Sequence, residues 1–245
     1  MRSMPPSAKE TVQIDTIAAG AAYAPDAALK MAGLGDNVRV RAGSAGAETL
    51  FADGEGDIPL VTVDGAVYQM LKTPKDVGAG MLGGQVGSVQ QVSDQPSLAS
   101  GEALRAGLSN VVQEGAAVYA VRGLPQTTAV AAEVNGSMRI FQRVSYAGRG
   151  PAGSSLEETF SVRGKVKRLE LSGVGELTGE AANRAIDVLL DQAVLQSSDA
   201  SSRRQTLTVT LDSGLKLQLG VSGDTLCGCG GWSCPAFFEA FEAAL

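Results

Sequence analysis

Short runs in which every second residue is apolar dominate the first two thirds of the chain, and this alternation predicts β-strands. Asp64-Gly65 and Asn135-Gly136 lie between pairs of such runs and are typical of two-residue hairpin turns. We therefore expect the region 36–150 to be strand-rich, with the character of a small barrel or a sandwich. The expected strands cover 38–41, 59–63, 66–71, 85–92, 117–122, 129–134 and 138–146.

The pattern changes after a stretch rich in Gly, Pro and Ser at 148–155, which we interpret as a linker. A buried stripe at helical spacing then predicts a helix from an N-cap at Thr178 to about 195. The order expected from 162 is β-α-β-β-β-α, an antiparallel sheet with helices on one face. Its strands are expected at 162–171, 207–211, 215–219 and 225–229, and its last helix at 235–245.

These patterns predict an α+β protein with three regions. Residues 1–35 are rich in Ala, Pro and Gly and are expected to be poorly structured. The β-rich domain follows at 36–150, and an α+β domain with a C-terminal cysteine cluster and helix occupies 156–245. Because aromatic residues make up only 4% of the chain, the core must be built mainly from aliphatic side chains.

Charge and composition exclude several classes of function. The net charge is −6 and no cluster of Lys and Arg is visible, which argues against nucleic-acid binding. The chain has no histidine, so it lacks Ser-His-Asp and Cys-His catalysis and His-ligated zinc. We identify no catalytic, cofactor-binding or metal-binding residue here, expect no cofactor, and favour a protein that is not an enzyme.

Two motifs have simpler explanations than chemistry. Residues 78–83 match GxGxxG, but no strand precedes them and no helix follows, so we interpret them as a glycine loop. Glu239 and Glu242 are three residues apart on the last predicted helix. Opposite the apolar Phe237 and Phe241, they are typical of a solvent-exposed helix face rather than of a pair of catalytic acids.

All three cysteines lie within eight residues that also hold the single tryptophan, from Cys227 to Cys234. In a strand, Cys227 and Cys229 would face the same side, and Cys234 would be the N-cap of a helix that begins at Pro235. These positions favour three alternatives: a metal site, a redox-active thiol, or a structural role. The structural role is preferred, as a disulfide from Cys234 to Cys227 or Cys229 that fastens the last helix to the sheet, or as buried thiols.

Parts of the chain resemble uncharacterised extracytoplasmic domains of Gram-positive bacteria, which usually follow a lipoprotein signal or a membrane anchor. The likeness covers about 58–147 and 160–245 and implies no activity. It is carried by Gly, Tyr and Val patterns at 64–68, 82–89, 115–123 and 130–136, and by a closing Cys-x-x-Trp-Ser-Cys-Pro-x-Phe-Phe-x-x-Phe at 229–241.

Residues 1–10 lack the apolar core of a signal peptide, and no apolar run is long enough to span a bilayer. Two locations stay open: an extracytoplasmic one, with a leader or anchor removed, or the cytoplasm. The resemblance favours the first.

We expect a non-enzymatic extracytoplasmic domain that binds or senses an unknown ligand, such as a small molecule or a cell-surface protein. It would contact a membrane only through an anchor that this chain lacks, and it would bind at a groove or a sheet edge. The alternative is a thiol-based metal-binding or redox protein that uses Cys227, Cys229 and Cys234.

Overall fold

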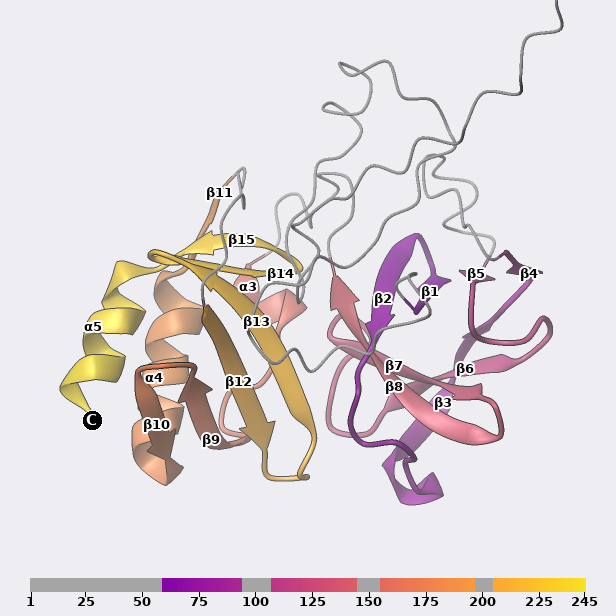
Figure 1. Cartoon of the computed structure of the whole chain (residues 1–245), viewed down its shortest axis with the longest axis horizontal. Coiled ribbons are helices and arrows are strands. Elements are labelled where there is room, and N and C mark those ends of the chain that lie inside the picture. Colours follow the sequence, from indigo (N-terminus) through magenta and orange to yellow (C-terminus); the bar gives the residue numbers. More distant parts are fainter. Residues whose placement is uncertain (1–58, 94–106, 145–154, 197–204) are drawn as a thin grey trace, which may run out of the picture.

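The structure, a computed structural model, describes residues 59–93, 107–144, 155–196 and 205–245. The expected N-terminal segment 1–35 and the strand at 38–41 lie outside these residues. Two β-sheets lie side by side, and two helices cover the face of the second sheet that points away from the first (Figure 1). The fold is therefore α+β, as the sequence predicts.

The first sheet has eight strands in the order β3-β6-β7-β8-β2-β1-β5-β4, antiparallel except for the pair β4 and β5. It curls into a half-barrel, because β3 at one end of this order also contacts β1. The elements are β1 (Leu60–Val63), β2 (Ala66–Met70), η1 (Ala79–Met81), β3 (Leu82–Ser88), β4 (Gln91–Val92), β5 (Leu108–Ser109), β6 (Ala117–Val121), β7 (Ala129–Val134) and β8 (Ser137–Val144).

Both predicted hairpin turns are confirmed. Asp64 and Gly65 have φ of 51° and 79°, and Asn135 and Gly136 have φ of 51° and 78°. These left-handed values match the twist of the flanking strands, which is why Asp-Gly and Asn-Gly are favoured there. The inner face of the curled sheet buries a cluster of mainly β-branched residues with Tyr68 and Phe141.

The second sheet is antiparallel throughout, with seven strands in the order β10-β9-β12-β13-β14-β15-β11. Its elements, with the helices, are α3 (Leu156–Thr159), β9 (Val166–Leu171), β10 (Gly175–Thr178), α4 (Gly179–Gln192), β11 (Val194–Gln196), β12 (Gln205–Leu211), β13 (Lys216–Ser222), β14 (Thr225–Gly228), β15 (Gly230–Ser233) and α5 (Pro235–Ala243).

The exact order β-α-β-β-β-α is not confirmed, because β10, β11 and β15 are additional strands. The predicted helix begins after Thr178 as expected, but it ends at Gln192, with Ala193 as its C-cap, instead of continuing to about residue 195. The predicted last strand is interrupted at Cys229, where the chain reverses into β15.

The two sheets are joined through a shared hydrophobic core and a buried polar link. The core cluster that contains the residues of α4 and α5 extends to Leu71, Ala131 and Ile140 of the first-sheet region. The link is made by Gln142 of β8, whose side chain donates to the carbonyl oxygen of Gln218 over 2.7 Å and accepts from its N–H over 2.9 Å.

The position of Gln218 explains this link. β14 pairs with β13 only at Gly220–Ser222, and its chain turns back before it reaches Gln218. The side-chain amide of Gln142 satisfies the buried backbone groups that a longer β14 would have satisfied. A residue of one sheet thus completes the hydrogen bonding of the other.

Candidate functional site

The three cysteines occupy three different settings. Cys227 lies in β14, Cys229 in the turn between β14 and β15, and Cys234 at the N-cap of α5 with Pro235 in the first helical turn, as predicted. All three are buried, with exposed fractions of 0%, 7% and 1%. All three are free thiols.

The disulfide predicted from Cys234 to Cys227 or Cys229 is therefore not formed in the structure. For Cys227, the reason is the alternation of side chains along β14. Leu226 belongs to the core between the sheet and the helices, so Cys227 points to the opposite face. Cys234 belongs to the helix-side core with Leu226, which separates it from Cys227 by the thickness of the sheet.

The thiols of Cys229 and Cys234 are held in their neutral form. Burial raises the pKa of Cys229 above its ordinary value, and the nearby positive charge of Arg143 only partly opposes this. Burial also raises the pKa of Cys234, and a hydrogen bond with the backbone of Phe237 only partly opposes it. Because the thiolate is the nucleophile and the metal ligand, both shifts reduce reactivity.

The surroundings of Cys229 include a buried phenol from the other sheet. Tyr68 of β2 donates a hydrogen bond from its hydroxyl to the carbonyl oxygen of Gln126 over 3.0 Å. Burial raises the pKa of Tyr68 to about 12, Arg143 opposes the rise, and the nearby Asp64 carboxylate adds to it. Among the residues that the structure describes, no group of three or more His, Cys, Asp or Glu could hold a metal ion.

The cysteine segment fastens the sheet to α5 by packing. Trp232, 1% exposed, lies in the same core as Phe237 and Phe241, and its indole N–H donates to the carbonyl oxygen of Cys229 over 2.9 Å. At Gly230, φ is +102° and a Cβ would lie 2.9 Å from the indole nitrogen. Only glycine therefore permits the reversal from β14 into β15.

The reversal at Cys229 creates an exposed edge that sequence reasoning missed. β15 pairs with β14 on one side and with β11 on the other, so that Val194, Leu195 and Gln196 form the last strand of the sheet. The exposed fractions of Val194 and Leu195 are 63% and 38%, which places them among the five exposed large hydrophobic residues of the described chain. β11 lies at the upper rim of the sheet in Figure 1.

The apolar residues of β11 were visible in the sequence, but they were assigned to the end of the predicted helix. Val194-Leu195 continues the apolar content of α4, and three residues are too few for alternation to be recognised. What identifies the strand is its pairing with β15, a segment more than thirty residues away along the chain.

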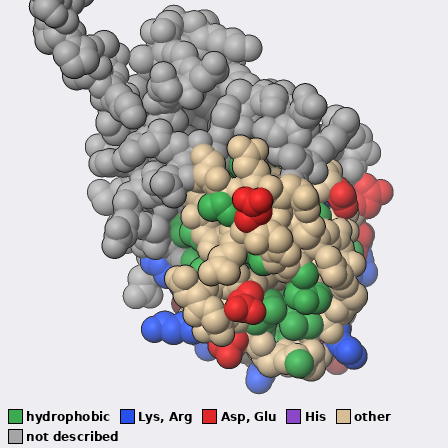
Figure 2. Space-filling view, turned by 90° about the vertical axis from the view of Figure 1, so that its right-hand side faces the viewer, with side chains coloured by type: hydrophobic (Ala, Val, Ile, Leu, Met, Phe, Trp, Pro, Cys, Tyr) green, Lys and Arg blue, Asp and Glu red, His purple; other side chains and the backbone are tan. Residues whose placement is uncertain are grey.

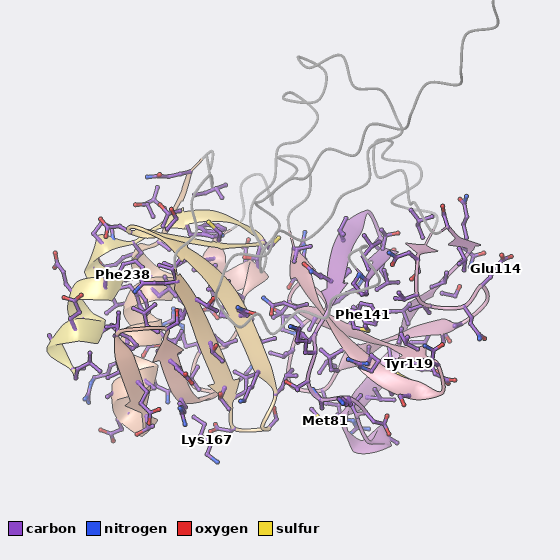
Figure 3. All side chains as sticks on the ribbon, in the orientation of Figure 1. Met81, Glu114, Tyr119, Phe141, Lys167 and Phe238 are labelled. Carbon is purple, nitrogen blue, oxygen red and sulfur yellow. The ribbon has the colours of Figure 1, made fainter. Side chains whose placement is uncertain are left out.

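A second exposed surface is formed by the first sheet. Figure 2, which looks at that end of the molecule, shows mainly uncharged surface with a group of hydrophobic side chains in its lower part. Met81 and Tyr119 lie at this end of the molecule, opposite Phe238 of α5 (Figure 3). Both side chains are partly buried against the shared core.

Among the described residues, no helix is both long and apolar enough to cross a membrane. Comparisons with protein-family models, with curated proteins and with solved structures found no match to this chain.

Proposed function

We propose that this chain is a non-enzymatic, extracytoplasmic binding domain and that the edge strand β11 is its binding element. The observation that supports the proposal is an uncharged, apolar edge strand with one side unpaired among the described strands. Natural edge strands are usually protected by charge, proline or a bulge. Val194-Leu195-Gln196 has none of these, so the edge is suited to pair with another strand.

The mode of binding would be addition of a strand. In an antiparallel pair, only alternate residues direct their backbone N–H and C=O groups to the neighbouring strand. The remaining backbone groups of β11 point outward and can bond to an extended segment of a ligand protein. Main-chain hydrogen bonds give affinity in such complexes, and the flanking side chains give specificity.

The support behind β11 is rigid. Leu195 is paired with the buried Trp232, and Val194 with Ser233, one residue before the N-cap of α5. A strand held by this packing loses little conformational freedom when a ligand binds. The free, buried cysteines then serve as small apolar core residues.

The extracytoplasmic location is proposed on the resemblance described above. Fractionation of cells that carry the native gene product tests it, since recovery in the cytosolic fraction alone would overturn this part of the proposal. That result would leave the binding role of β11 intact.

Substitution of Val194 by lysine tests the binding element. Peptides selected from a random extended-peptide display library against the folded protein should lose binding to Val194→Lys by tenfold or more. Val174→Lys is the matched control, because Val174 is also exposed, at 37%, but lies in the turn between β9 and β10. Equal binding to wild type and Val194→Lys would exclude β11 as the binding element.

A further inference from the structure

The turn between β7 and β8 holds an asparagine whose reactive groups are free. Asn135 and Gly136 are both exposed, beyond the last pair of the two strands, Val134 with Ser137. Among the described residues, neither the side chain of Asn135 nor the N–H of Gly136 has a hydrogen-bond partner. A Cβ placed on Gly136 would meet nothing within 4 Å, so this part of the backbone is open to water.

The other two asparagines of the described chain are held in place. The side-chain oxygen of Asn110 accepts from the N–H of Leu60 over 2.9 Å. The side-chain nitrogen of Asn183 donates to the carbonyl oxygen of Val166 over 2.7 Å. The backbone N–H that follows each of them is also occupied, by a bond to Ser109 after Asn110 and by the helix α4 after Asn183.

We propose that Asn135 is a site of spontaneous deamidation in the folded chain. The backbone nitrogen of Gly136 attacks Cγ of Asn135, and the side-chain nitrogen leaves as ammonia with the proton that Gly136 loses. Water then opens the succinimide ring at one of its two carbonyl carbons, which produces aspartate or isoaspartate at position 135. Glycine has no side chain to obstruct the ring, and its backbone can adopt the conformations that closure requires.

The aspartate product is compatible with the fold, because the chain already holds an aspartate in the same kind of turn. Asp64 and Gly65 connect β1 to β2 with φ of 51° and 79°. Asn135 and Gly136 have φ of 51° and 78°. Asp-Gly and Asn-Gly both suit this left-handed turn, so the added carboxylate leaves the backbone as it is.

The isoaspartate product does not fit this turn. Its main chain passes through the former side chain, which lengthens the backbone by one C–C bond, about 1.5 Å. A two-residue turn fixes the register of its strands, so the longer path disturbs the pairing of β7 with β8. β8 also carries Gln142, whose side chain bonds to Gln218 of the second sheet. This product therefore weakens the first sheet and its link to the second.

Peptide mapping after incubation of the folded full chain at pH 8 tests the proposal. Each of the four asparagines of the chain falls in a different tryptic peptide. A mass increase of one unit, assigned to its residue by fragmentation, should appear at least tenfold faster at Asn135 than at Asn110 or Asn183. An Asn135 that stays intact in the folded chain, after the urea-unfolded chain has reacted there, would overturn the proposal.

Asn135→Gly is the matched control, since Gly-Gly also suits the turn and has no side chain to react. Aged wild type should accept labelled methyl groups from an isoaspartate methyltransferase, and aged Asn135→Gly should accept at least tenfold fewer. Equal labelling of the two would place the isoaspartate elsewhere and refute the assignment. Asp64, whose carboxylate accepts from Gln126 over 3.0 Å, should stay aspartate in both.

The two products should differ in stability. Asn135→Asp should keep the Tm of wild type within about 1 °C, whereas the isoaspartate form, separated from aged wild type by chromatography, should melt about 3 °C or more lower. Equal Tm values for Asn135→Asp and the isoaspartate form would contradict the predicted change in register.

Discussion

Gln142 provides the sharpest test of how the two sheets depend on each other. Replacing it by methionine keeps a side chain of similar length but removes both hydrogen bonds to Gln218. The side chains of Gln142 and Gln218 are 2% and 0% exposed, so water cannot replace the lost partner. The N–H and C=O of Gln218 would then be buried without their partner on that side of the strand.

The expected cost follows from these two groups. A buried donor or acceptor left unsatisfied costs about 1–3 kcal/mol. Part of this cost is offset, because methionine has no polar amide that must lose its water when the chain folds. We therefore expect Gln142→Met to lower the free energy of unfolding by about 3 kcal/mol. In a protein of this size, such a loss corresponds to a fall in Tm of about 6–12 °C.

Urea unfolding followed by tryptophan fluorescence makes the test specific. The single tryptophan, Trp232, reports on the second sheet, whereas Gln142 belongs to the first. A shifted fluorescence midpoint therefore measures coupling between the sheets. Gln85→Met is the control, because Gln85 is exposed and its side chain donates to Gly87 at the surface. A fluorescence midpoint for Gln142→Met equal to that of the control would refute the reasoning.

Three further predictions concern the buried groups near the cysteine segment. Because the pKa of Tyr68 is raised from an ordinary 10 to about 12 in the folded chain, its contribution to stability is complete below pH 10 and is lost as the pH rises towards 12. Between pH 9 and pH 11, the free energy of unfolding in urea should therefore fall less for Tyr68→Phe than for wild type. Gly230→Ala should lower the free energy of unfolding by about 2–4 kcal/mol, against about 1 kcal/mol for Gly115→Ala, which also has positive φ but open space around it; equal costs would show that contact with Trp232 contributes nothing. A thiol reagent should label the native protein slowly at pH 8 and should find three thiols after denaturation without reductant; rapid labelling of the native protein would contradict the neutral, buried state of the cysteines.

The local elements were largely predictable because their signals are short-range. Asp64-Gly65 and Asn135-Gly136 specify hairpins through the backbone conformations that these residues tolerate. The buried stripe of α4 and the burial of Phe237 and Phe241 were likewise predictable, because the helical spacing of apolar residues is a local sequence signal. Strands of two or three residues carry no such period, and β4, β5 and β11 were not recognised as separate strands.

The sequence predicted a structural role for the cysteine segment, as a disulfide or as buried thiols, and the structure has buried, free thiols. Clustering of rare residues identified the segment from Cys227 to Cys234, and it does fasten the last strands to α5. Proximity along the chain suggested a disulfide. The helix-side core includes Leu226 and Cys234, so Cys227 faces the other side of the sheet, and which face of β14 meets the helices depends on tertiary packing.

What the sequence by itself determined is the set of local conformations (hairpin turns, helix starts and buried stripes), together with a net negative charge and the absence of histidine. What only the tertiary structure decided is which segments meet. Pairing of β11 with β15 turned the end of a helix into an exposed sheet edge, and the early reversal of β14 left Gln218 to be satisfied by Gln142. Both depend on contacts between residues distant in sequence, whose free energy appears only when the whole chain is folded.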